Sequence, residues 1–517
     1  MKQSSKPTNG IAQHAQLKLF TRHSPIQAVQ FDGLNRRRFV QRILAAGAGA
    51  HFVGLGLPAF AEELLQNPGP AIGPPKRLDS VRRWNKIAID ASGIDHAIAR
   101  EQLGPGRASR AMAIVHIAIF DAITAAVGQF ESYAGVKAPP GPISLQAAVG
   151  QAAHDTLSEL FPAQAATFET LLAEDLRAIK NRPARANGIL LGRRAASECL
   201  RLRANDGSET PEPLIGVGYI TSNDPGRWRM DPVSLIPLAL GAHWGECKPF
   251  ALESTSQFRV PLPPAMTSPE YTAAYNEAKS VGGDGVITPT VRTADQTHAG
   301  LFWAYDGLPS LCAPPRLYNQ ITVQIADQMG SDVIETARLL ALVNVAMADA
   351  GMAVWESKYF YDYWRPVTGI RESEPGSGPT GAGDGNPDTI GDPTYSPLGA
   401  PASNVSGGIN FTPPFPTYPS GHAGFGGALF QTLRRFYGTD EIPFTFVSDE
   451  FNGITVDNLG NVRPLLPRSF ANLSQAEEEN GQSRIYLGIH WAFDKTESII
   501  LGRKVGDYVF DNVFRPL

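Results

Sequence analysis

Residues 332 to 364, DVIETARLLALVNVAMADAGMAVWESKYFYDYW, carry the strongest helical pattern of the chain. Apolar residues recur through this stretch at helical spacing, so it predicts one long helix. Its aromatic-rich end contains Lys358 and leads into Arg365 and Pro366. Because proline disfavours helical geometry in the residue before it, we expect the helical run to end at Arg365.

Helical patterns cover most of the chain on both sides of this stretch. They lie at residues 107–127, 144–161, 162–180, 186–206, 315–330, 421–437, 467–489 and 494–512. The first of these is apolar nearly all round, so His116 and Asp121 within it are interpreted as satisfied polar groups of a core helix rather than as catalytic residues. No β-rich pattern, internal repeat or GxGxxG loop accompanies these helices. The sequence predicts an all-α fold with two helical-bundle lobes, long Pro/Gly-rich loops and an active site in the C-terminal bundle.

Two Pro/Gly-rich regions divide the helical patterns. Residues 207–295 have weak periodicity, and we interpret them as a long connection between the lobes. The expected parts are a leader at 1–61, an N-terminal helical lobe plus connecting region at 62–290, and a C-terminal catalytic domain at 291–517. Residues 371–419 form a second long loop, which ends directly on Ser420. A loop of this length within a compact domain usually has a function.

The overall composition limits the classes of function. Of the 517 residues, 43% are hydrophobic and 18% are charged, which is typical of a soluble globular protein. The formal net charge of −5 gives no indication of a nucleic-acid partner. Cys199, Cys247 and Cys312 show no metal-binding spacing, so zinc and iron–sulfur sites are not expected, and buried small hydrophobes are the favoured interpretation.

The N-terminal region resembles an export signal. NRRRFVQ at residues 35–41 is followed by an apolar run rich in Gly and Ala, which ends in Ala59-Phe60-Ala61. This order is typical of a twin-arginine signal peptide with cleavage near Ala61. The alternative is an uncleaved segment that anchors the protein to a membrane. We expect an exported protein, periplasmic or extracellular, with no membrane span in the mature chain.

Three separate segments carry side chains that suit an oxyanion. Lys358 and Arg365 are seven residues apart, which would place both on one face of a helix. The other two segments are Ser420-Gly421-His422 at a predicted helix start and SRIYLGIHWAFD at residues 483–494, which contains Arg484, His490 and Asp494. Asp494, one turn after His490, could fix the tautomer of that imidazole.

Each segment alone also has an ordinary structural interpretation. Ser420 could be a simple N-cap, and a Lys/Arg pair is usually part of a solvated helix face. Together, however, the segments supply guanidinium, ammonium, hydroxyl and amide donors, which suit a tetrahedral oxyanion. Two histidines remain for acid–base work and for attack or coordination.

The combined pattern Lys-x6-Arg-Pro, Pro-Ser-Gly-His and Ser-Arg-x3-Gly-x-His-x3-Asp resembles the superfamily of type 2 phosphatidic acid phosphatases and vanadium-dependent haloperoxidases. The surrounding segments are similar to the fungal-type vanadium chloroperoxidases. These segments are residues 292–307, 314–321, 355–366, 398–404 and 413–438. The resemblance covers roughly residues 290 to 512, and the chain does not carry the long C-terminal tail of the fungal enzymes.

The resemblance implies one vanadate per active site and a role for each matching residue. The residues that would hold the vanadate oxygens are Lys358, Arg365, Ser420, Gly421 and Arg484. His490 Nε2 would be the axial ligand of vanadium, His422 would handle the protons of peroxide, and Lys358 would polarise the bound peroxide. Asp306 would pair with Arg484, and Trp355 and Phe415 would lie beside the halide site. The implied partners are hydrogen peroxide and halide, with an organic acceptor and a homodimer left open.

Three other functions remain as alternatives. A secreted acid phosphatase would use the same site, with His490 attacking phosphorus and His422 protonating the leaving oxygen. A non-catalytic phosphate- or vanadate-binding protein would need only donors and leaves the two histidines unexplained. A membrane-lipid phosphatase is disfavoured, because no later stretch offers about 20 uninterrupted apolar residues.

Overall fold

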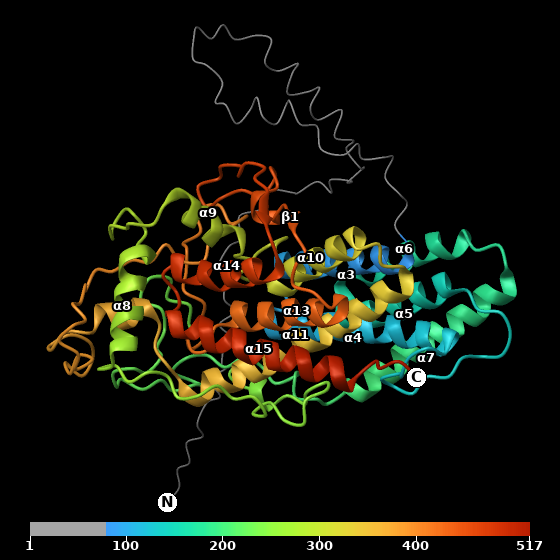
Figure 1. Cartoon of the computed structure of the whole chain (residues 1–517), viewed down its shortest axis with the longest axis horizontal. Coiled ribbons are helices and arrows are strands. Elements are labelled where there is room, and N and C mark those ends of the chain that lie inside the picture. The colour runs from blue at the N-terminus through green and yellow to red at the C-terminus, as the bar shows by residue number, and fades with distance from the viewer. Residues whose placement is uncertain (1–78) are drawn as a thin grey trace, which may run out of the picture. The chain divides into compact units, whose positions relative to one another are not determined.

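The computed structural model describes residues 79–517, and Figure 1 shows that helices dominate this part of the chain. The predicted signal peptide lies outside the described residues. The first group of α-helices is α3 (Ser80–Ala97), α4 (Gly104–Val127), α5 (Leu145–Leu160), α6 (Ala165–Arg177), α7 (Arg182–Arg203), α8 (Pro269–Gly282) and α9 (Ala294–Phe302). The second group is α10 (Pro314–Gln328), α11 (Val333–Tyr361), α12 (Pro366–Arg371), α13 (Gly421–Tyr437), α14 (Leu473–Tyr486) and α15 (Ala492–Asn512). The predicted all-α class is confirmed.

Short elements complete the described chain. Three-residue 3-10 helices lie at Pro162–Gln164 (η2), Trp244–Glu246 (η3) and Asp449–Phe451 (η4). Strands β1 (Phe444–Phe446) and β2 (Arg468–Phe470) pair antiparallel, with Phe444 opposite Phe470. Two sequence predictions are therefore wrong in detail. Residues 467–472 are not helical, because Arg468–Phe470 form β2 and α14 begins only after its Asn472 N-cap, and the proposed connecting region contains α8.

Helix α11 is the central helix that the sequence predicted. Asp332 caps its N-terminus through a capping box with Glu335, and its residues are buried on nearly every side. The helix ends at Tyr361, four residues earlier than predicted, because Asp362 adopts a left-handed conformation with φ of 51°. Arg365 is extended and caps α12 instead, so it does not share a helix face with Lys358 as the sequence suggested.

Helices from both halves of the chain pack against α11. It contacts α4 from the N-terminal half and α13 and α15 from the C-terminal half (Figure 1). The described residues group together as one compact unit. The domain boundary near residue 290 stays a prediction.

Two helices are long and apolar enough to cross a membrane by length and composition. They are α4 and α11, and 78% and 94% of their most apolar windows are buried inside the protein. Burial of this extent is what core helices of a globular protein show.

Close backbone contact between α13 and α15 fixes the N-terminal ends of these two helices relative to each other. A Cβ atom on Gly502 would lie 2.2 Å from the carbonyl oxygen of Gly424, so only glycine fits at residue 502. The same packing brings the start of α13 to the start of α15, where Ser420 N–H donates to the Asp494 carbonyl at 3.0 Å. The segments that hold Ser420 and His490 are thereby fixed relative to each other.

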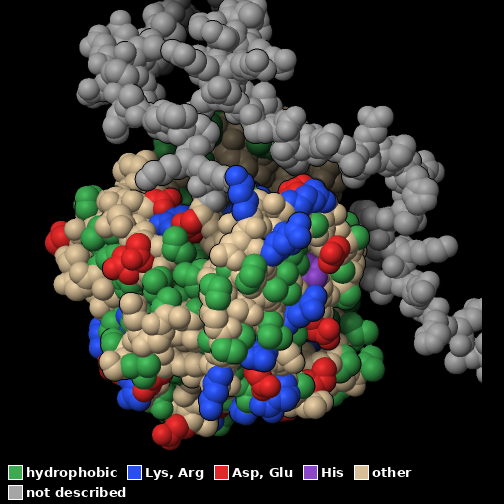
Figure 2. All heavy atoms as spheres, turned by 90° about the vertical axis from the view of Figure 1, so that its right-hand side faces the viewer, with side chains coloured by type: hydrophobic (Ala, Val, Ile, Leu, Met, Phe, Trp, Pro, Cys, Tyr) green, Lys and Arg blue, Asp and Glu red, His purple; other side chains and the backbone are tan. Residues whose placement is uncertain are grey.

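The surface and the cysteines agree with the composition. On the face drawn in Figure 2, basic and acidic side chains are interspersed rather than gathered by sign. All three cysteines are buried and free, as expected for small core residues.

Candidate active site

The predicted site residues meet in one buried place, although they come from separate segments. Lys358 lies in the last turn of α11, Arg365 at the start of α12, and Arg484 in the last turn of α14. Ser420 and Gly421 open α13. We call these five residues the anion cradle. The four with side chains are at most 1% exposed.

Backbone carbonyls of the 415–417 segment orient two of the cations. Lys358 Nζ donates to the carbonyls of Pro416 and Thr417 at 2.8 and 2.9 Å. Arg365 Nε donates to the Phe415 carbonyl at 2.9 Å. The two side chains therefore converge because one loop binds both, and not because they share a helix face.

Arg484 is held by a carboxylate from the N-terminal side of the site. Its Nη2 donates to Asp306 Oδ1 at 2.6 Å, which is the pairing that the family resemblance implied. Asp306 follows a turn in which Tyr305 has a φ of 46°. The pair leaves two further nitrogens of the guanidinium for other partners.

Several buried donors of the anion cradle lack a partner within the protein. These atoms are Arg365 Nη2, Arg484 Nε, Arg484 Nη1 and Ser420 Oγ. Buried polar groups are almost always hydrogen-bonded, and an unpaired donor costs roughly 1–3 kcal/mol. Four such atoms beside a buried ammonium therefore fit a bound oxyanion, which would accept from all of them.

Ser420 decides between the two interpretations of the helix start. It occupies the N-cap position of α13, but its side chain makes no capping hydrogen bond. A serine that only capped the helix would accept from the N–H of one of the next residues. Gly421, as the first helical residue, has an N–H with no intrahelical partner. Both groups are thus available to an anion at the helix N-terminus.

His490 is held in one tautomer by a carboxylate and a hydroxyl. Its Nδ1 lies 2.7 Å from Asp494 Oδ2 and 3.2 Å from Thr417 Oγ1. Because the carboxylate only accepts, Nδ1 carries the proton and Nε2 keeps a lone pair. Arg365 Nη1 donates to this Nε2 at 3.0 Å. The lone pair therefore faces the anion cradle.

His422 follows Gly421 in the first turn of α13. Its Nε2 is 2.5 Å from the Ala304 carbonyl, so this nitrogen carries the proton and Nδ1 has the lone pair. The side chain is 7% exposed, compared with 2% for His490. Of the two histidines, His422 is thus the better placed to exchange protons with small molecules.

The site concentrates positive charge in a dry environment. Burial lowers the pKa of Lys358 well below its ordinary value, and the charge of Arg365 lowers it further. Burial also lowers the pKa of Arg365 to about 9. The pKa values of both histidines are well below the usual range, again through burial first and then through nearby arginines. Both imidazoles are therefore neutral near pH 7, and an anion would stabilise the cations around them.

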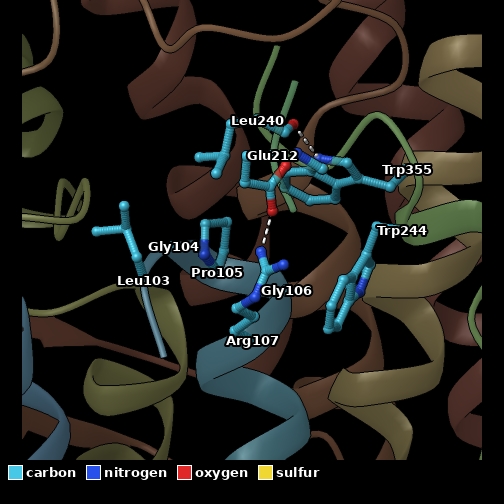
Figure 3. A pocket seen from close by; sticks show the side chains of 10 residues that line it. Leu103, Gly104, Pro105, Gly106, Arg107, Glu212, Leu240, Trp244 and Trp355 are labelled. Atoms are coloured by element: carbon cyan, nitrogen blue, oxygen red, sulfur yellow. Dashed lines mark hydrogen bonds and ion pairs between the residues drawn. The ribbon is translucent and has the colours of Figure 1, made fainter. Parts of the chain in front are cut away.

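An aromatic wall borders the cationic side of the site. The rings of Trp355 and Phe415 lie 4.9 Å apart, and Lys358 Nζ is 5.1 Å from the centre of the Phe415 ring. A small pocket lies beside Trp355, where Arg107 and Glu212 form an ion pair (Figure 3). Apart from Trp355, none of the residues predicted for the site lines this pocket.

Sequence analysis did not identify Thr417 or Ala304 as members of the site. Thr417 contacts His490 and Asp494 with its hydroxyl and Lys358 with its carbonyl. In the sequence, the only indication that Thr417 belongs to the site is its position three residues before Ser420. Ala304 contributes only a carbonyl, which has no signature in a sequence.

Comparison with known proteins agrees with this site. The family model for the VCPO second helical-bundle domain matches residues 338–517, which hold the whole anion cradle and both histidines. The vanadium chloroperoxidase of Curvularia inaequalis is 32% identical over 513 residues, covering 83% of this chain and 81% of the relative.

Solved structures share the fold. A bacterial vanadium-dependent iodoperoxidase superposes with a TM-score of 0.66 at 23% identity, covering 85% of this chain and 98% of the other. The holo form of a bacterial vanadium-dependent chloroperoxidase superposes with a TM-score of 0.58 at 16% identity, with the same two coverages. At these identities the structures establish a common fold.

Proposed function

Because the chain belongs to the vanadium haloperoxidases, we propose that its anion cradle holds vanadate and that its two histidines serve the oxidation of halide by hydrogen peroxide. The chain is a vanadate-dependent haloperoxidase, and its product is hypohalous acid. The observation that carries the assignment of the site is the set of unpartnered donors on Arg365, Arg484 and Ser420. The comparisons do not favour the acid phosphatase alternative.

Vanadate fits the donors that the anion cradle presents. It is a tetrahedral oxyanion, and the donors are two guanidinium groups, an ammonium, a hydroxyl and a backbone amide. When bound, it supplies Lewis acidity that activates hydrogen peroxide toward halide. His490 Nε2 is the single protein nitrogen that we assign to the metal, through its lone pair.

The two histidines have different roles in the proposed reaction, one as a ligand and one in proton transfer. Asp494 keeps the proton of His490 on Nδ1, so Nε2 would become a ligand without a change of tautomer once Arg365 Nη1, which donates to it here, turns to the bound anion. The Ala304 carbonyl keeps the proton of His422 on Nε2, so Nδ1 can take a proton from hydrogen peroxide and return it later. The low pKa of each imidazole favours these neutral states.

We assign halide binding to the aromatic wall. Trp355 and Phe415 provide a polarisable apolar surface, and the nearby Lys358 and Arg365 supply positive charge. Such a surface removes water from an approaching halide while the cations compensate its charge. Lys358 Nζ, 5.1 Å from the centre of the Phe415 ring, would supply positive charge to an anion held in the cradle and to a halide at this wall.

The direct test is a paired assay on purified protein freed of metal and phosphate. We expect peroxide-dependent bromination of a dye only after orthovanadate is added, with suppression by excess phosphate. Hydrolysis of a phosphate ester is measured on the same sample. Phosphate release that vanadate inhibits, without any bromination, would contradict the haloperoxidase assignment and support the phosphatase.

Vanadate affinity should fall as the pH rises, and the fall should begin at a lower pH than an ordinary lysine would give. The lowered pKa of Lys358 means that its proton, and its attraction for the anion, is lost at a lower pH than for an ordinary lysine. One linked proton changes the dissociation constant by up to about tenfold per pH unit. Titrations from pH 6 to 9 measure this slope.

Lys358→Arg is the matched control for this slope. Arginine holds its proton more strongly than lysine, so the slope of the variant lacks the Lys358 contribution and reports the ionisation of vanadate together with that of Arg365, whose pKa burial lowers to about 9. A smaller slope in the variant is expected. Equal slopes in both proteins would show that Lys358 does not titrate in the site.

For the N-terminal segment we propose export by the twin-arginine route, with a mature chain that starts near Glu62 and has no membrane span. The support is the order of Arg36-Arg37, Phe39 and the following apolar run. N-terminal sequencing of the secreted protein tests it, and a mature protein that retains residues 35–61 would contradict it. We also propose a homodimer, which light scattering on the purified protein tests.

A further inference from the structure

A second buried charged cluster lies outside the anion cradle. Glu450 is fully buried in η4, and Ser403 Oγ donates to its Oε2 at 2.7 Å. Arg463 Nη1 forms an ion pair with the same Oε2 and donates to Ser403 Oγ at 2.8 Å. A buried ion pair often adds little to the free energy of unfolding, so stability alone does not account for this cluster.

The cluster packs against the turn at residues 303–306. Glu450 lies in η4, directly after Ser448 and Asp449. Its neighbours bind the same turn, because Asp449 N–H donates to the Tyr305 hydroxyl at 2.6 Å and Ser448 Oγ donates to the Phe302 carbonyl at 2.7 Å. Tyr305 has a positive φ, a conformation that persists in a non-glycine residue only when its surroundings hold it.

This turn makes two contacts with the active site. The Ala304 carbonyl accepts from His422, and Asp306 accepts from Arg484. Glu450 Oε1 and Asp306 Oδ2 are both buried without a partner, and burial first, with the charge of Asp306 adding to it, raises the pKa of Glu450 to about 7. A shift of the turn would therefore move the proton-handling histidine and one vanadate-binding arginine together.

We propose that Glu450 is a positioning residue for halide oxidation. Together with Ser403 and Arg463, it fixes the turn that orients His422 and Arg484. It acts through Ala304 and Asp306 and does not touch the substrate. The inference rests on the proposed function of the anion cradle.

The test is Glu450→Gln in the full chain. Glutamine keeps the volume and can still accept from Ser403, but it loses the charge that holds Arg463. We expect turnover of bromide to fall by about 10- to 100-fold, the range typical of residues that orient metal ligands. We expect the dissociation constant of vanadate to rise by roughly tenfold within the same range.

A double-mutant cycle with Asp306→Asn separates positioning from general destabilisation. If Glu450 acts through Asp306, the double variant should bind vanadate about as weakly as Asp306→Asn alone. Fully additive losses of affinity would overturn the proposal. An unchanged affinity and turnover in Glu450→Gln would overturn it as well.

Glu477→Gln is the matched control. Glu477 is a buried carboxylate on α14, paired with Arg434 and Arg503, so it undergoes the same chemical change at another place. We expect a lower melting temperature with unchanged vanadate affinity. Equal losses of affinity in both variants would overturn the positioning role. Wild-type protein that neither binds vanadate nor oxidises bromide would instead contradict the proposed function.

Discussion

Replacing His490 with alanine is expected to abolish vanadate-dependent bromide oxidation, and excess vanadate should not restore it. The variant removes the only nitrogen lone pair that we assign to the metal, while Lys358, Arg365 and Arg484 remain to attract the anion. Removing an outer partner of a metal ligand costs about 10- to 100-fold, so loss of the ligand itself should exceed that range. Steady-state bromination against vanadate concentration measures the effect.

Asp494→Asn provides the graded comparison for this result. It keeps His490 but replaces the carboxylate that fixes its tautomer, so a loss within about 10- to 100-fold is expected. A smaller loss in His490→Ala than in Asp494→Asn would be inconsistent with His490 as the ligand. Thermal unfolding of both variants checks that the fold is retained.

Replacing His422 with alanine should lower turnover by about 10²- to 10⁴-fold, the usual contribution of a general acid–base residue. The anion cradle does not need this imidazole, so the dissociation constant of vanadate should change little. The expected signature is a loss in kcat at nearly constant vanadate affinity. Vanadate titration and peroxide kinetics on the same preparation measure both quantities.

The opposite division of effects would change the assignment of His422. A large loss of vanadate affinity with normal turnover at saturation would place His422 in the anion cradle instead of in proton transfer. Wild-type protein at matched vanadate saturation is the reference for both comparisons. His422→Gln serves as a second variant, since it can still donate to the Ala304 carbonyl but offers no basic nitrogen.

The residues predicted for the site converge in the structure, but for a different reason than the sequence suggested. Lys358 and Arg365 were expected on one helix face, yet α11 ends at Tyr361 and a loop gathers both cations. Seven-residue spacing carries no information about the left-handed Asp362 that ends the helix. Ser420 and the boundaries of α13 were predicted correctly, because a proline, a serine and a glycine directly before an apolar pattern define a helix start.

The missed elements depend on tertiary structure. Helix α8 lies in a Pro/Gly-rich region where local pattern is weak, and its burial against α14 and α15 compensates for that. The Ala304 carbonyl leaves no trace in the sequence. Glu450 is about 150 residues from the turn that its neighbours Ser448 and Asp449 bind, so only the folded chain reveals their relation.

The anion cradle has a consequence for the order of assembly. Its residues extend from Lys358 to Arg484 along the chain, and the carboxylate that holds Arg484 lies further back at Asp306. No short fragment brings these groups together, so an unfolded chain offers vanadate only isolated cations. Cofactor capture must follow folding, and bound anion then protects the native state, by about 2.7 kcal/mol at a hundredfold excess over its dissociation constant.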